Sequence, residues 1–90
     1  MNINVLAAKM SYSKEDGFVG KVDFQVEGHK HAYEMTLYSK RGKEWDYGLL
    51  FLNESGSEED ILAVEDVLED DDELFQRLVD AAKKELTIQA

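Results

Sequence analysis

The spacing of apolar residues changes from a strand period to a helix period in the middle of this 90-residue chain, around residues 55–57. Before this point apolar and polar residues alternate, which is typical of strands with one buried face. After it apolar residues recur every three or four positions, which is typical of helices with one buried stripe. Because the strands come first and the helices follow, the order predicts one α+β domain, with a sheet half at residues 1–53 and a helical half at residues 57–88.

The alternation is clearest at residues 18–27 and 33–37, which predict the two central strands of the sheet. Between them lies Glu27-Gly28-His29-Lys30, where the glycine permits the positive φ of a tight turn. Asp16-Gly17 gives a similar turn signal before the first of these strands. Two more apolar segments, at residues 5–8 and 47–52, complete the predicted fold: a four-stranded antiparallel meander followed by two helices packed on one face.

The first and last of these strands are apolar on both faces, which is typical of strands that are covered on both sides. In a meander, however, they would be the exposed edges, where apolar strands promote aggregation. Three resolutions are open. The two strands pair and close the sheet, a helix covers the free face, or the last strand forms a homodimer contact through Leu50 and Leu52.

In the helical half, Ser57 is the predicted N-cap of a helix that begins with acidic residues. A single helix from Glu58 to Leu86 would be about 44 Å long, which exceeds the size of such a domain. We therefore predict a break at Glu69–Asp72 with Asp70 capping a second helix, and one continuous helix is the alternative. The predicted core combines both halves and contains Phe18, Val22, Phe24, Val26, Tyr33, Met35, Leu37, Leu49, Phe51, Ile61, Val64, Leu68, Phe75, Leu78 and Ala82.

The formal charge of −10 lies entirely in the helical half of the chain. Residues 1–53 carry seven acidic and seven basic side chains, whereas residues 54–90 carry thirteen acidic and three basic ones. The acidic residues are densest at the predicted helix break, in the cluster Glu65, Asp66, Glu69, Asp70, Asp71, Asp72 and Glu73. Like charges four residues apart destabilise a helix by about 0.2–0.5 kcal/mol per pair, so the cluster lowers the stability of the helix that carries it.

This acidic cluster predicts a non-enzymatic interaction module whose acidic helical face binds a protein with a basic surface. The first alternative is a nucleic-acid mimic that blocks a DNA- or RNA-binding protein, because such proteins present Lys and Arg to phosphates. A purely structural explanation is a solvated helix face that keeps the protein soluble. Calcium binding is disfavoured, since ligand loops alternate their ligands and turn on glycine.

Two further groups of residues are candidate sites. His29 and His31 would project to one face of a strand, which makes a small metal-binding protein the second alternative, although a third ligand is missing. Exposed histidines at a hairpin tip are the simpler explanation. Lys40, Arg41 and Lys43 lie near aromatic residues, but an acidic chain lacks the basic footprint of a nucleic-acid-binding domain, so direct nucleic-acid binding is not predicted.

The chain contains no cysteine, so disulfides, thiol nucleophiles and zinc–thiolate sites are excluded. Its longest apolar runs have four residues, which predicts neither a signal peptide nor a membrane span, and we expect a cytoplasmic protein. Phosphate loops and hydrolase motifs are absent from the sequence, and we expect neither catalysis nor a cofactor. No motif is specific enough to identify a family.

Overall fold

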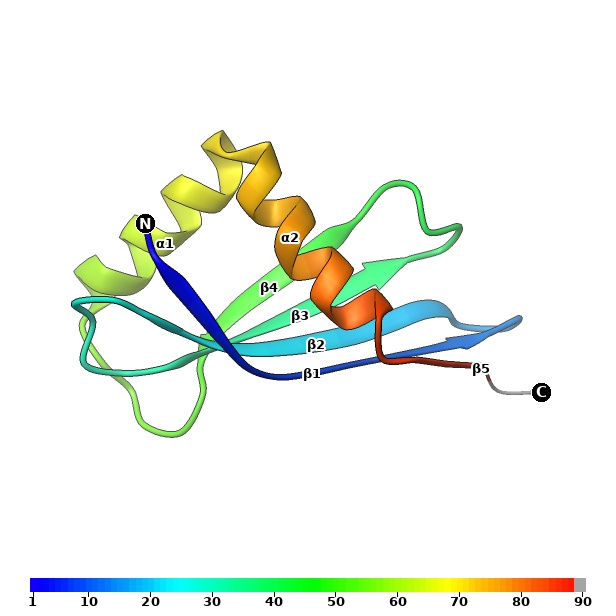
Figure 1. Cartoon of the computed structure of the whole chain (residues 1–90), viewed down its shortest axis with the longest axis horizontal. Helices are drawn as coiled ribbons and strands as arrows, with labels where there is room; N and C mark the ends of the chain where they lie inside the picture. The colour runs from blue at the N-terminus through cyan, green and yellow to red at the C-terminus, as the bar shows by residue number, and fades with distance from the viewer. Residues whose placement is uncertain (89–90) are drawn as a thin grey trace.

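The computed structural model describes residues 1–88, which form one mixed sheet with two helices on the same side of it (Figure 1). In chain order the elements are β1 (Ile3–Ser13), β2 (Gly17–Val26), β3 (Tyr33–Ser39), β4 (Asp46–Phe51), α1 (Glu58–Asp70), α2 (Asp72–Lys83) and β5 (Leu86–Ile88). The α+β class and the four-stranded antiparallel meander are as predicted, and the structure adds a fifth strand to them.

The four long strands pair in sequence order because connections of only three to six residues join them. Gly17 and Gly28 both have positive φ angles, of 78° and 89°, as expected for glycines at these turns. The registers place alternate residues of β2 and β3 between the sheet and the helices, so that Val22 lies opposite Met35 and Phe24 opposite Tyr33. The period-2 pattern in the sequence therefore corresponds to a sheet with one covered face.

The fifth strand corrects the prediction that the helical half extends to residue 88. Helix α2 ends at Lys83, and β5 then pairs in parallel with the second half of β1, with Met10 opposite Leu86. The sheet order is therefore β4-β3-β2-β1-β5, and the sheet is mixed rather than purely antiparallel. Leu86 continues the three-to-four-residue spacing of α2, so periodicity alone assigned it to the helix.

The edges of the sheet resolve the conflict over the two apolar strands in part. Closure of the sheet is wrong, because the second neighbour of β1 is β5 and β1 does not pair with β4. Instead, β5 covers the edge of β1 over three residue pairs, and the helices cover the inner face of β4, where the Tyr47 and Phe75 rings meet edge to face at 5.5 Å. Leu50 lies on the other face of β4 and remains 54% exposed. The dimer contact stays a prediction.

The core lies between the sheet and the two helices. Every residue predicted for it is buried or packs against the buried cluster. Tyr33 lies at its centre, fully buried, and its ring stacks on Phe24 and Phe51 at 5.6 and 5.4 Å. Met10, Leu74 and Val79 are also buried and were not predicted. Within residues 1–88, neither helix is long and apolar enough to cross a membrane.

Candidate functional site

The two helices meet at Asp71, whose side chain caps the start of α2. Its Oδ1 accepts a hydrogen bond from the backbone N–H of Leu74 at 3.1 Å, and its own N–H donates to the Val67 carbonyl at 2.8 Å. The break thus lies within the predicted interval, and the single continuous helix is wrong. The prediction that Asp70 is the cap is also wrong: Asp70 is still helical, whereas Asp71 has the extended backbone that a cap requires.

At the opposite end of α1, the predicted cap is confirmed. The Ser57 side chain accepts a hydrogen bond from the backbone N–H of Asp60 at 3.4 Å, and Ser57 has an extended backbone. Glu58 and Glu59 follow in the first turn, where the positive end of the helix dipole stabilises them. The chain therefore forms two short, capped helices instead of one continuous helix. Their junction forms a corner on the outside of the molecule (Figure 1).

Five carboxylates gather at this junction, and we call them the acidic corner: Asp66, Asp70, Asp71, Asp72 and Glu73. Together with Val67 they line a shallow depression of about 430 Å³. All five side chains are exposed. Within residues 1–88, the ion pairs that form involve Lys21 on the sheet, and none involves a carboxylate of the corner. The corner therefore presents negative charge to solvent without a basic neighbour bound to it.

Local structure stabilises only part of this charge. Asp72 and Glu73 lie in the first turn of α2, where the helix dipole favours them. Asp66 and Asp70 are four residues apart at the end of α1, where both their mutual repulsion and the negative end of the dipole oppose them. The last turn of α1 contains no basic residue that would offset this cost. A basic partner at the corner would relieve the repulsion.

The remaining two residues of the predicted face, Glu65 and Glu69, lie on the flank of α1 next to Tyr47 of β4. The Tyr47 hydroxyl of β4 donates a hydrogen bond to Glu69 Oε1 at 2.9 Å. Burial of the phenol, this hydrogen bond and the charges of Glu69 and Glu65 raise the pKa of Tyr47 to about 12. The structure therefore brings five of the seven predicted residues together and places two beside Tyr47.

The two histidines have separate surroundings. They lie in the connection between β2 and β3, not on a strand as the metal hypothesis assumed. His29 Nδ1 lies 2.7 Å from the Tyr33 hydroxyl, whereas the His31 ring packs edge to face against Phe51 at 6.3 Å. Among residues 1–88, no three histidine or carboxylate side chains are arranged to hold a metal ion.

The basic cluster lies in the connection between β3 and β4. Lys40, Arg41 and Lys43 are exposed there, as expected for a solvated connection. Trp45 is half-buried, with its ring 6.0 Å from that of Phe18 and the Lys83 ammonium 5.7 Å from its centre. The tryptophan of this segment therefore packs inward and is not displayed beside the basic side chains.

The face of the sheet opposite the helices was not recognised from the sequence as a surface of interest. We call it the open sheet face, and its side chains come from alternate positions on the strands: Ala7, Lys9, Ser11, Val19, Lys21, Asp23, Glu34, Thr36, Tyr38, Asp46, Gly48, Leu50 and Thr87. A depression of about 840 Å³ lies over its centre. Two signals in the sequence mark it: Val19 and Tyr38 are apolar residues at positions where the alternation calls for polar ones.

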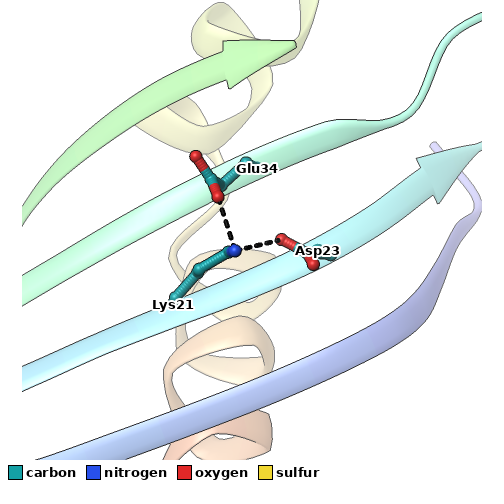
Figure 2. A network of polar contacts seen from close by, with 3 residues as sticks. All are labelled: Lys21, Asp23 and Glu34. Carbon is teal, nitrogen blue, oxygen red and sulfur yellow. Dashed lines mark ion pairs between the residues drawn. The ribbon is translucent and has the colours of Figure 1, made fainter. Parts of the chain in front are cut away.

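A polar network crosses this face between two strands, and Figure 2 shows it in close-up. The Lys21 ammonium on β2 lies 2.7 Å from Glu34 Oε1 on β3 and 3.8 Å from Asp23 Oδ1. The hydrogen bond to Glu34 is the largest contribution that raises the pKa of Lys21. Asp23 Oδ1 is buried and has no hydrogen-bond partner among the described residues. The centre of the face is thus held together by its own opposite charges.

The two residues predicted as dimer contacts differ in position. Leu50 belongs to the open sheet face and lies opposite Glu34 on β3. Leu52 follows the end of β4, is half-buried, and its backbone N–H donates to the Ala32 carbonyl at 3.0 Å. Leu50 is therefore the better placed of the two for contact with a second molecule.

No protein-family model, curated protein or solved structure matches this chain. The function must therefore be inferred from the surfaces themselves.

Proposed function

We propose that this protein is a non-enzymatic interaction module whose acidic corner binds a basic surface on another protein. One observation carries the proposal: five exposed carboxylates surround a depression at the helix junction, with no ion pair to a basic residue within residues 1–88. Clustered, uncompensated charge accelerates association with an oppositely charged surface and orients the encounter.

Two further features support an interaction role over simple solubility. Of the basic residues of α2, Arg77 lies one turn after Glu73 and Lys83 about three turns after the corner, and neither forms an ion pair with a carboxylate of the corner in the described part of the chain. In addition, Val67 is half-buried among the carboxylates, so the depression offers a small apolar contact as well as charge. A surface that served only to keep the protein soluble would need neither clustered carboxylates nor a depression among them.

The test replaces Asp70, Asp71 and Asp72 by Asn, which removes three charges from the corner. Asn caps helices as well as Asp does, so α2 keeps its start. A matched control removes the same charge from exposed loops, with Gln at Glu15, Glu44 and Glu54. Each protein is immobilised, binding proteins are recovered from a cell lysate and identified, and the affinity of each is then measured with purified components.

We expect the corner variant to bind the recovered partner at least about tenfold more weakly than the wild type, and the loop control to bind almost normally. Wild-type binding should also weaken between about 0.1 and 1 M NaCl, since the screening length falls from about 10 to about 3 Å. Binding that is equal in wild type and corner variant, and insensitive to salt, would show that the corner is not the binding surface.

The nucleic-acid mimic is the narrower form of the same proposal, in which the basic surface is one that normally holds phosphates. Competition decides between the two. If a short DNA or RNA duplex displaces this protein from its partner, the acidic corner acts as a mimic. If the partner holds both at once, the corner binds a separate basic surface.

A further inference from the structure

The open sheet face carries large apolar side chains that no part of residues 1–88 covers, because both helices lie on the other side of the sheet (Figure 1). Val19, Tyr38 and Leu50 are 46%, 44% and 54% exposed on this face. Val19 and Tyr38 line a depression of about 840 Å³ together with smaller residues such as Ser11, Thr36 and Gly48, and Leu50 lies outside it. Exposed apolar patches are typical of interfaces, and here the charges of Lys21, Asp23 and Glu34 lie between the two apolar ends of the face.

The total surface of the chain is large for its mass. Its accessible surface is 6157 Å², whereas a compact monomer of 10.3 kDa is expected to expose about 5,400 Å². The excess is roughly 750 Å², and each partner in a standard interface buries about 800 Å². The elongated shape of the molecule, 41 × 25 × 18 Å, contributes to this excess, and one interface of standard size would bury an area of the same order.

The distribution of charge identifies a second copy of this chain as the occupant. Acidic residues dominate the helical side, so two copies repel each other through it. The open sheet face also carries basic residues, with Lys9 and Lys21 against Asp23, Glu34, Asp46 and, at the border of the depression, Glu85. A surface that carries both signs can be complementary to itself, which a symmetric dimer requires.

Pairing through the free edge of β4 is the competing arrangement, and the position of α1 disfavours it. Helix α1 packs on β4, where Glu69 accepts the hydrogen bond from Tyr47. Two β4 strands joined edge to edge would bring the two acidic α1 helices to the same side of the joint sheet. Contact between open sheet faces instead keeps both helical layers on the outside.

We propose that the open sheet face is the interface of a symmetric homodimer in which two sheets pack face to face. This proposal goes beyond the interaction at the acidic corner and does not depend on it. Packed sheets lie about 10 Å apart with their strands nearly aligned, so residues of facing strands meet directly. A two-fold axis parallel to the strands, between β2 and β3, places β2 over the partner's β3 and β1 over the partner's β4.

The strand register then determines which residues meet. Val19 and Tyr38 occupy the same row of the sheet, so each Val19 faces the partner's Tyr38. Ala7 and Leu50 share another row, with Asp23 and Glu34 between them, and so Ala7 faces the partner's Leu50. The aromatic ring of Tyr38 enters the partner's depression, where buried aromatic residues contribute most to binding.

The same axis pairs opposite charges. Lys9 shares a row with Gly48, which has no side chain, and Asp46 is the next residue of β4 on this face. Each Lys9 therefore reaches the partner's Asp46 across Gly48. Asp23 faces the partner's Glu34, but both carboxylates are already held by Lys21 in their own copy. The like charges at the centre of the interface are therefore compensated within each copy, and the Lys9–Asp46 pairs on its two flanks attract each other.

The test measures the molar mass of the full chain by light scattering and sedimentation from roughly 1 to 100 µM, which lies at or above the dissociation constants of interfaces of this size. We expect twice the 10.3 kDa of one chain, and the dimer should persist at about 1 M NaCl because apolar contact dominates it. Val19→Glu and Leu50→Glu should each weaken dimerisation by roughly a hundredfold, since they bury an unpaired charge.

Leu62→Glu is the matched control, because Leu62 is a leucine of similar exposure, 49%, on the outer side of α1. It should leave the dimer intact, and circular dichroism must show all three variants folded. The proposal is overturned if the wild type keeps a mass of 10.3 kDa throughout, or if Leu62→Glu weakens the dimer as much as the sheet variants. A monomer whose Leu50→Glu variant loses a different bound protein would assign the face to that protein instead.

Charge reversal tests the axis itself. Lys9→Glu and Asp46→Lys should each weaken the dimer roughly tenfold, because like charges then face each other. The double variant restores opposite charges and should recover most of the affinity. If the double variant dimerises no better than the single ones, the two residues do not meet and the proposed axis is wrong. Neither result depends on the acidic corner, whose variants should dimerise normally.

Discussion

The acidic corner and the open sheet face lie on opposite sides of the core and treat charge in different ways. The five carboxylates of the corner have no ion-pair partner within residues 1–88, whereas Lys21 on the sheet holds both Asp23 and Glu34. The corner is a shallow hollow of about 430 Å³, and the sheet depression measures about 840 Å³. The comparison teaches that the two proposed contacts would differ in kind: the contact at the corner would be driven by charge and sensitive to salt, and the contact at the sheet would be driven by buried area.

Both surfaces depend on the apolar layer that lies between them, and the largest predicted effect is there. Leu78 on α2 is 1% exposed, whereas Leu62 on α1 is 49% exposed. Leu78→Ala should lower the free energy of unfolding by about 3 kcal/mol through lost burial and an unfilled cavity. Leu62→Ala should change it by less than about 0.5 kcal/mol. Urea unfolding followed by circular dichroism measures both, and similar values for the two variants would contradict the assignment of the helices' inner sides.

The sequence predicted this layer well because burial leaves a periodic pattern. Val22 and Phe24 alternate along β2, and Val64, Leu68 and Leu78 follow the helical spacing, so the pattern alone identified them as core. Such patterns arise wherever one face of an element is covered, and they need no knowledge of the partner element.

Features that depend on tertiary placement were not predictable in the same way. The strand β5 has three residues, too few for a period, and Leu86 fits the helical stripe that precedes it. The choice between Asp70 and Asp71 as cap depends on one backbone rotation within a run of aspartates. The contact of Glu69 with Tyr47 depends on how α1 is rotated relative to the sheet. The density of charge along the sequence does not indicate this rotation.

Within the corner, the Asp71 carboxylate has a structural role as the cap of α2, whereas the Asp70 carboxylate does not cap a helix. Asp71→Ala should lower the free energy of unfolding by about 1 kcal/mol through loss of the bond to the Leu74 N–H, and Asp71→Asn should preserve it. Asp70→Ala should be neutral or slightly stabilising, since it removes repulsion with Asp66. Thermal unfolding of the three variants compares them. A larger loss for Asp70→Ala than for Asp71→Ala would mean that the helix break is placed one residue too late.

The smallest effect concerns Tyr47, through which the sheet contacts the acidic helix. Tyr47→Phe removes the hydrogen bond to Glu69 and should lower the free energy of unfolding by about 1 kcal/mol or less at neutral pH. The fold holds the phenol neutral, because burial first and Glu69 second raise the pKa of Tyr47 from 10.0 to about 12. The stabilisation that results is fully present below pH 10 and is lost as the pH rises from 10 through about 12.

The stability difference between wild type and Tyr47→Phe should therefore stay constant up to about pH 10 and shrink above it, since every other titrating group is common to both proteins. Glu69→Gln is the control, because it keeps an acceptor and removes the charge. Its Tyr47 should ionise at a pH below about 12 but above the ordinary value of 10.0, since burial remains, and tyrosinate absorbance follows this step. Parallel stability curves for wild type and Tyr47→Phe across this range would show that the phenol is not held neutral. Glu69 would then belong with the free carboxylates of the corner rather than with the sheet.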